Sequence, residues 1–137
     1  MATSSAWALQ QALYGALVGD AVLTGLLGGT AIYDGLPQDA DPPYVTFAQS
    51  LARDWSAGDE DGEEHVITLH VWSEWAGRKQ VHEIMSAVRD LLHGADLTLT
   101  AHRLVNLRHE FSDARREPGA EMFRGITRYR AVTEPSV

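Results

Sequence analysis

The stretch from Pro42 to Trp75 constrains the fold most strongly, because it has the pattern of one long antiparallel hairpin. The pattern predicts strands over Tyr44–Trp55 and His65–Trp75, joined by a tip over Ser56–Glu64. Successive side chains of a strand point to opposite faces of a sheet. One face of the second strand would therefore carry Ile67, Leu69 and Val71, and the other Val66, Thr68, His70 and Trp72.

The expected tip is strongly acidic, with five carboxylates and two glycines between residues 58 and 64. The carboxylates belong to Asp59, Glu60, Asp61, Glu63 and Glu64. Like charges at this density do not pack into a core, because each buried charge needs a partner of opposite sign. The tip is therefore expected to project into water or towards a binding partner.

Length and composition indicate an ordinary soluble protein with one domain, covering residues 1–137. The chain has no cysteine, which excludes disulfides, thiolate metal sites and a cysteine nucleophile. No apolar run approaches the roughly 20 residues that a membrane-spanning helix needs. No Lys or Arg precedes Arg53, so the basic start of a signal peptide is missing. We therefore expect an intracellular protein without a membrane partner.

The net charge of −8 is distributed unevenly along the chain. Residues 1–100 hold 14 of the 19 acidic residues, whereas residues 101–137 hold seven of the 11 basic ones. All seven are arginines: Arg103, Arg108, Arg115, Arg116, Arg124, Arg128 and Arg130. An acidic chain argues against a nucleic-acid-binding face, whereas opposite charges on different parts of one molecule suit head-to-tail contact between copies. The alternative is a solvated surface whose charges simply segregate.

Apolar residues at helical spacing predict three helices, over residues 6–18, 21–27 and 79–92. The first would bury Leu9, Leu13, Ala16 and Leu17, and the third Val81, Ile84, Met85, Val88, Leu91 and Leu92. Ser4 or Ser5 can cap the first helix and Asp20 the second. Trp7 lies near the first apolar stripe, and we expect it to anchor the core rather than stack on a ligand.

A second hairpin is expected in the C-terminal third, with strands over Arg103–Arg115 and Glu121–Thr133 and a turn over residues 117–120. Alternation in its first strand groups Val105, Leu107, His109 and Phe111 on one face. In its second strand, one face would carry Phe123, Tyr129 and Ala131 and the other Arg124, Arg128 and Arg130. The order α-α-β-β-α-β-β predicts an α+β fold: an antiparallel sheet of about four strands with helices packed on one face.

Motifs for catalysis or cofactor binding are missing from the sequence. His65 and His70 are five residues apart in one strand, so they point to opposite faces and cannot share a metal ion. The acidic tip has the charge of a calcium loop without its spacing. There is no Gly-x-Ser-x-Gly nucleophile elbow and no phosphate-binding loop ending in Gly-Lys-Ser/Thr. We therefore assign no catalytic, cofactor-binding or metal-binding residue and expect no enzyme.

Several short motifs, read together, resemble a known family. They are the segment from Asp20 to Gly29, the segment Ala31-Ile32-Tyr33-Asp34-Gly35-Leu36-Pro37-Gln38 and the run Pro42-Pro43-Tyr44-Val45. The later strand Val66–Trp72, the helix Lys79–Leu92 and the ending Arg128-Tyr129-Arg130 agree in pattern. This combination resembles the small phage tail-completion proteins, formerly a domain of unknown function, of siphophages and phage-like gene transfer agents.

The resemblance implies a tail terminator: a ring, expected to be a hexamer, that caps the tail tube and stops its polymerisation. Its partners would be the tail tube protein and the head–tail connector or stopper, and its place the virion tail or neck after assembly in the host cytoplasm. DNA would pass through the lumen without specific binding. The sequence does not distinguish a phage from a gene transfer agent.

Two sets of residues receive hypothetical roles in such a ring. Arg124, Arg128 and Arg130 are placed at the subunit interface, where they would meet an acidic neighbour. The acidic tip either lines the lumen, where its charge keeps DNA from sticking, or faces the tube or the connector.

Other functions stay open at this point. Within the same particle, a head–tail stopper or a tail-tube subunit also fits a small α+β chain. A different class is a stand-alone binding module or small cytoplasmic enzyme with a cleft between the helix 79–92 and the sheet. That class predicts a monomer or dimer with perturbed titratable groups in a pocket.

Overall fold

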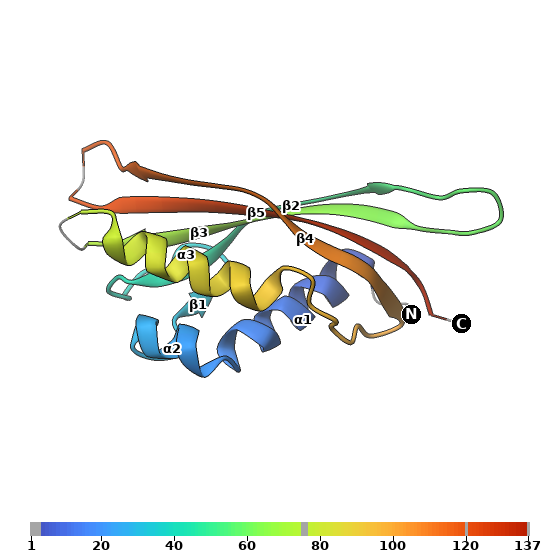
Figure 1. Ribbon diagram of the computed structural model, residues 1–137, viewed down its shortest axis with the longest axis horizontal. Coiled ribbons are helices and arrows are strands. Elements are labelled where there is room, and N and C mark those ends of the chain that lie inside the picture. Colours follow the sequence, from blue (N-terminus) through green and yellow to red (C-terminus); the bar gives the residue numbers. More distant parts are fainter. Residues whose placement is uncertain (1–3, 75–76, 120, 137) are drawn as a thin grey trace.

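The computed structural model describes residues 4–74, 77–119 and 121–136, in which three helices pack on one face of a five-stranded sheet (Figure 1). This arrangement confirms the α+β class and the placement of the helices. The elements in chain order are α1 (Ser5–Val18), α2 (Ala21–Leu27), β1 (Ile32–Tyr33), β2 (Tyr44–Asp54), β3 (Glu63–Ser73), α3 (Lys79–Leu92), β4 (His102–Arg116) and β5 (Phe123–Pro135).

The sheet has the strand order β1-β2-β3-β5-β4, so two hairpins meet along the antiparallel pair β3 and β5. The prediction of about four antiparallel strands missed β1, which pairs in parallel with β2 at Ile32–Val45 and makes the sheet mixed. β1 is only two residues long, and its pairing depends on a backbone hydrogen bond from Val45 N–H to Ala31 O at 3.0 Å. A pattern this short carries no strand signal by itself.

The three helices begin and end close to the predicted residues. Ser4 caps α1 by accepting from Trp7 N–H, and Asp20 caps α2 by accepting from Leu23 N–H. The expected apolar stripes are buried or half-buried against the sheet. The prediction for Trp7 is wrong, because its side chain is 49% exposed. At 100° per residue, Trp7 and Tyr14 lie almost in line on α1, on a face that points away from Leu13 and the core.

Helix α3 sits directly on β5, and a glycine makes this close approach possible. A Cβ atom added at Gly125 would lie 2.7 Å from Met85 Sδ and 2.8 Å from Val81 Cγ2. Both distances are shorter than van der Waals contact, so the missing side chain of Gly125 sets the depth at which α3 packs.

Two bulges in β4 change the faces that simple alternation predicts. The register passes from Leu104–Thr133 to Asn106–Val132, so Val105 is an extra residue and is 46% exposed. A second shift follows His109, which pairs with Tyr129, whereas Phe111 pairs with Arg128. The prediction that groups Val105, Leu107, His109 and Phe111 is therefore wrong, because each extra residue reverses the parity of the strand.

Candidate functional site

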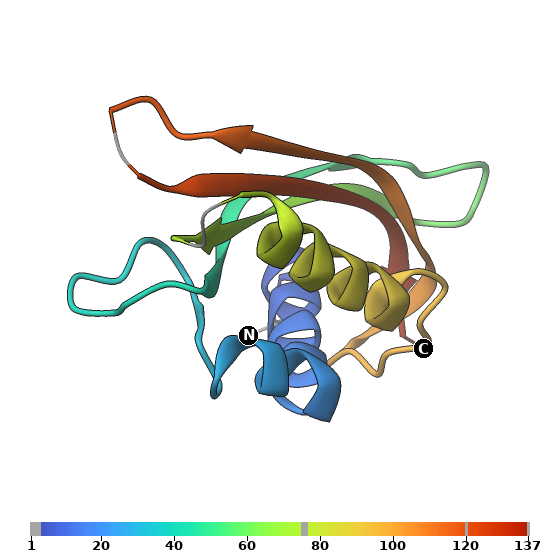
Figure 2. The same ribbon diagram turned by 60° about the vertical axis from the view of Figure 1, so that its left-hand side comes forward.

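The helices cover one face of the sheet and leave the opposite face, here called the open face, without a helix (Figure 2). The open face carries the charged and aromatic side chains described below. β5 contributes Arg124, Arg128 and Arg130 to it, because these residues alternate with the helix-facing Gly125, Thr127, Tyr129 and Ala131. The structure thus brings together on one face the three arginines that sequence reasoning singled out.

Each of the three guanidinium groups lies over an aromatic ring. Arg124 Cζ is 5.7 Å from the ring centre of Trp72, Arg128 Cζ 5.1 Å from Phe111 and Arg130 Cζ 5.0 Å from Trp55. These distances suit cation–π attraction, which is strongest for Trp among the side-chain rings. The rings come from β3, from β4 and from the segment after β2, so β5 is the strand that joins them. We call these three pairs the arginine–aromatic ladder.

Glu64 connects the ladder to the first hairpin. Its carboxylate accepts from Arg130 Nε and from Arg53 Nε, both at 2.5 Å. These hydrogen bonds, that from Arg130 first, hold the pKa of Glu64 below its usual value. Glu64 is 5% exposed although it carries a charge. Two arginines on one carboxylate are the compensation that makes this burial tolerable.

The position of Glu64 corrects the expected extent of the acidic tip. Glu63 and Glu64 lie in strand β3, where they pair with Asp54 and Arg53 of β2, so the hairpin connection covers residues 55–62. From the sequence pattern, we expected the five neighbouring carboxylates to form one exposed cluster. Glu64 is instead neutralised by two arginines, from β2 and β5, which lie 11 and 66 residues away along the chain. Contacts between residues so far apart cannot be predicted from the local pattern.

The remaining arginines of the open face are less completely paired. Arg124 Nε lies 3.3 Å from Glu117 Oε2, an ion pair without hydrogen-bond geometry. The Nε–H of Arg128 is buried and, among the described residues, has no hydrogen-bond partner. A buried donor without an acceptor is costly to the isolated chain. Because this atom is shielded from solvent, an acceptor of a partner would reach it only after the Arg128 side chain moves.

The acidic tip itself is exposed and lies at one end of the molecule, opposite the turn between β4 and β5 (Figure 1). Ala57 and Glu60 exchange backbone hydrogen bonds of 2.9 and 3.0 Å, which close a small turn with Gly58 at φ 60°. Asp59, Glu60 and Asp61 all point into solvent from this turn. Their exposure agrees with the expectation from charge density.

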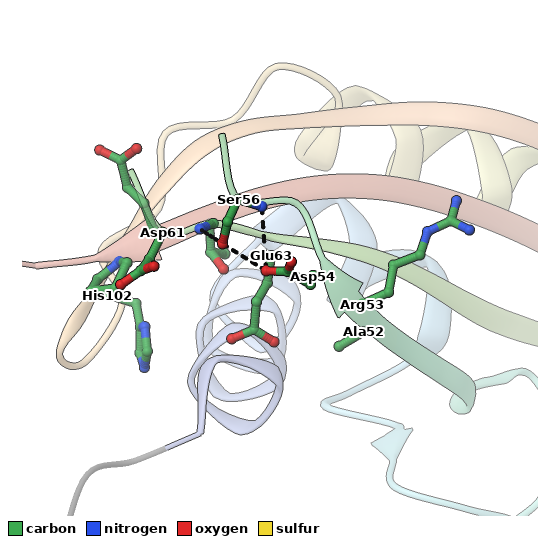
Figure 3. A pocket seen from close by; sticks show the side chains of 11 residues that line it. Ala52, Arg53, Asp54, Ser56, Asp61, Glu63 and His102 are labelled. Carbon is green, nitrogen blue, oxygen red and sulfur yellow. Dashed lines mark hydrogen bonds between the residues drawn. The ribbon is translucent and has the colours of Figure 1, made fainter. Parts of the chain in front are cut away.

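A pocket of about 460 Å³ opens at the base of the tip, between the first hairpin and the end of β5 (Figure 3). Its carboxylates are largely engaged by the protein itself. Asp54 accepts from Ser56 Oγ at 2.6 Å, Glu63 from Ser5 Oγ at 2.7 Å, and Glu134 from Arg103 Nε at 2.8 Å. No group of three or more His, Asp or Glu side chains in the described part of the chain is arranged to hold a metal ion.

Sequence reasoning missed the aromatic partners of the arginines and a second aromatic surface on α1. Trp7, Tyr14 and Phe47 line a groove of about 440 Å³ between α1 and β2. Trp72 and Phe111 could be matched to Arg124 and Arg128 only with the register of β3, β4 and β5, which a single sequence does not supply. Within the described ranges, no helix has the length and apolar character needed to cross a bilayer.

Comparisons with known proteins agree with this architecture. The model of the family described as "Tail completion protein gp17" matches residues 11–134. A chain in the solved structure titled "Virion of native gene transfer agent (GTA) particle" superposes with a TM-score of 0.88 at 36% sequence identity. The match covers 97% of this chain and 99% of that chain. No curated protein matches the chain.

These matches show that the chain is a structural protein of a phage-type tail. They place it in the tail or neck of a virion. Within that class, the chain belongs to the tail completion protein gp17 family. The resemblance seen in the sequence motifs is thereby confirmed.

Proposed function

We propose that the protein is a tail terminator, which assembles as a ring on the end of the tail tube, stops tube polymerisation and joins the tail to the head. The observation that carries this proposal is the near-complete match to a chain of a gene transfer agent virion. A ring of six copies is our working assumption. Its partners would be the tail tube protein on one side and a connector or stopper protein on the other.

The open face supports a role in contacts between subunits. Arginine and aromatic residues are enriched in the centres of protein interfaces, where they supply large contact areas and directional hydrogen bonds. The arginine–aromatic ladder offers both. We place Arg124, Arg128 and Arg130 at or beside the subunit interface, facing acidic groups of the neighbouring copy.

In such a ring the acidic tip either lines the lumen or faces the tail tube or the connector. Carboxylates of Asp59, Glu60 and Asp61 in the lumen would repel the phosphate backbone and let DNA pass without specific binding. Glu63 and Glu64 have no such role in this proposal, because Ser5 and the two arginines engage them inside one copy. Reversing the charge of Asp59, Glu60 and Asp61 together is expected to slow DNA delivery, and unchanged delivery contradicts the lumen placement.

The proposal includes no catalytic step and treats residues 1–137 as one domain. Helices α1, α2 and α3 and the sheet share one hydrophobic cluster, from Ala8 in α1 to Ala131 in β5, and this supports treating them as a unit. The pocket at the base of the tip takes part in no proposed reaction.

Electron microscopy of particles produced without this gene tests the proposal. Overlong, headless tubes beside filled heads without tails are the expected result. Normal tails joined to heads overturn it, and heads without any tubes indicate a tube or initiation component instead. A complemented strain that carries the intact gene is the control.

Alanine at Arg124, Arg128 and Arg130 together tests the interface. The triple variant is expected to reproduce the overlong tubes of the deletion. Because Arg130 also neutralises Glu64, circular dichroism of the purified chain checks that the variant folds, and Arg124→Ala with Arg128→Ala, which keeps this pair, is expected to give the same overlong tubes. Tails of normal length contradict the interface assignment without affecting the terminator function.

A further inference from the structure

The two outer edges of the sheet, formed by β2 and β4, differ in how much of their length is covered by other parts of the chain. Among the described residues, β2 has a strand neighbour on its outer side only at Val45 and Thr46, through β1. From Phe47 to Asp54 the outer edge of β2 has no strand partner among the described residues, and Ala48 to Asp54 are exposed. An unpaired edge of this length presents a row of free N–H and C=O groups and is a template for another strand.

The usual protections of an edge strand are weak on β2. Residues 47–52 carry no charge and no proline, and the one irregularity lies at its start, between Phe47 and Gln49. One hydrogen bond shows which N–H groups of β2 point outwards: Trp55 N–H donates to Gly62 O at 2.8 Å, so the N–H of Trp55 points into the hairpin. Donors alternate along a strand, so the N–H groups of Ser50 and Ala52 point outwards, away from β3.

A groove runs along this edge and would hold an added strand on its helix side. Gln10 and Leu13 of α1 form one wall, and Phe47, Ala48 and Ser50 of β2 form the other. The groove continues into the aromatic surface of Trp7 and Tyr14, which are 49% and 44% exposed. A free strand edge beside an exposed helix is the geometry by which a sheet accepts an extended segment.

The outer edge of β4 is protected along its first half. Gly94 N–H donates to Leu107 O at 2.8 Å, and His109 N–H donates to His93 Nδ1 at 3.0 Å. Residues 110–116 have no strand neighbour on their outer side within the described residues. The free part of β4 is therefore seven residues long, close to the eight of residues 47–54 on β2.

Charge favours contact between these two edges of different copies. Residues 34–62, which include β2 and the loops at both its ends, hold seven carboxylates and one arginine. Residues 102–116, which form β4, hold four arginines and two carboxylates. Direction agrees as well: three successive antiparallel pairs link β2 to β4, so β4 of a like-oriented second copy would run antiparallel to β2.

We propose that the free edge of β2 takes up the free half of β4 from a second copy, so that neighbouring subunits share one antiparallel sheet. This inference rests on the proposed ring and adds a contact between strand edges to the contact proposed for the open face. Such a contact is heterologous, as a closed ring requires, because the two surfaces are different parts of the chain. It places Arg115 and Arg116 of one copy near the start of β2 of the next, on the side of the acidic segment 34–41.

Cysteine cross-linking in assembled particles tests the contact, and the cysteine-free chain provides a clean background. The register puts Ser50 and Ala52 of β2 on the same sheet face as Ser112 and Ala114 of β4. Within one copy, β2 and β4 are three strand spacings apart, roughly 14 Å, whereas a disulfide needs Cα atoms within about 7 Å. A disulfide between these positions therefore joins two copies.

The four double variants that combine Ser50→Cys or Ala52→Cys with Ser112→Cys or Ala114→Cys are oxidised in purified particles. The expected result is a ladder of covalent multimers on a non-reducing gel in at least one pair, which collapses with reductant. Ser50→Cys with Ser86→Cys, on the exposed side of α3, is the matched control and should stay monomeric. Particles with normal tails and no multimers in any pair overturn the inference and leave the terminator function intact.

A backbone variant provides an independent test. Ala52→Pro removes an outward N–H and no hydrogen bond of the chain's own sheet, so the purified chain should fold. In particles it should reproduce the overlong tubes of the gene deletion, whereas Ala52→Val, which keeps the N–H, should give normal tails. Normal termination by Ala52→Pro also overturns the inference. A deletion strain with normal tails would count against the terminator function itself and is scored separately.

Discussion

The two faces of the sheet are formed by the same strands but carry different kinds of side chain. The helix-covered face is built from fully buried aliphatic side chains such as Leu69, Val71 and Ala131, which pack against α1 and α3. The open face carries arginines over aromatic rings and one buried carboxylate with two cations. Burial of apolar surface stabilises a fold strongly, whereas exposed ion pairs contribute ~0–1 kcal/mol each and a buried pair must first offset its desolvation. We therefore expect the helix-covered face to supply most of the stability, and contact with partners remains our proposal for the open face.

The largest effect should come from the helix-covered face. Leu69 is completely buried in β3, so Leu69→Ala leaves a cavity and should lower the free energy of unfolding by about 2–5 kcal/mol. Leu51→Ala is the matched control, because Leu51 lies on the open face and is 49% exposed. Urea unfolding followed by circular dichroism measures both. A similar loss for the two variants would break the comparison.

The second effect tests packing at the closest contact between helix and sheet. Gly125→Ala forces a Cβ atom into the space of Met85 and Val81 and should cost about 1–3 kcal/mol. Gly15→Ala, in α1, meets nothing within 4 Å and should instead stabilise the chain by about 0.5–1 kcal/mol. Opposite signs in thermal unfolding are expected. A neutral Gly125→Ala would mean that α3 can move away from β5 at little cost.

The two faces also differ in how well their residues could be predicted from the sequence. The helices, both hairpins and the inward residues of α1, α3 and β3 follow from periodicity, because a buried face imposes a strict repeat. Bulges have no such signature, and the two in β4 moved Val105 and Phe111 away from their expected face. Trp7 was misplaced for a different reason: helical spacing already puts it about 120° around the helix from Leu13, and the expectation of a core anchor neglected that angle.

The open face could be predicted only in part. Alternation along β5 correctly grouped Arg124, Arg128 and Arg130, since no bulge interrupts that strand. Their aromatic partners and the burial of Glu64 depend on which strands are neighbours. Strand order brings together residues that are far apart in sequence. The pairing of β3 with β5, which are separated in the chain by α3 and β4, cannot be predicted from any local sequence pattern.

A pH effect comes next, from a histidine on the helix-covered face. Burial lowers the pKa of His65, which is 0% exposed and hydrogen-bonds to Thr133 Oγ1 at 2.9 Å. A lowered pKa means that the unfolded chain binds the proton first, so stability is full above pH 6.5 and falls as pH decreases. His65→Gln should flatten the decline in unfolding free energy between pH 7 and pH 5. If the decline in unfolding free energy is unchanged in His65→Gln, protonation of His70 and His109 must cause it instead. Burial also lowers the pKa values of these two histidines.

The buried carboxylate of the open face should respond in a more acidic range. Because Arg130 and Arg53 lower the pKa of Glu64, its contribution is present above the ordinary value of 4.5 and is lost as pH falls through the lowered one. Glu64→Gln should therefore be less stable than the parent at pH 7 and approach it near pH 3. Denaturant titrations at the two pH values measure this. A stability difference that stays the same at both values would show that packing, not charge, carries the effect of Glu64.

The smallest effect on stability is expected from Arg128, and it separates the two faces most sharply. Its guanidinium stacks on Phe111 and, among the described residues, pairs with no carboxylate, so Arg128→Ala should change the free energy of unfolding by less than about 1 kcal/mol. Removing its buried, unsatisfied Nε–H relieves a desolvation cost, which offsets part of the lost stacking. If the open face serves contact with partners, the same variant should nevertheless reduce the yield of particles with correctly terminated tails. Arg108→Ala is the control, because Arg108 lies on the same face opposite Arg130 but is exposed. A variant at Arg128 that lost stability and kept termination would reverse the roles assigned to the two faces.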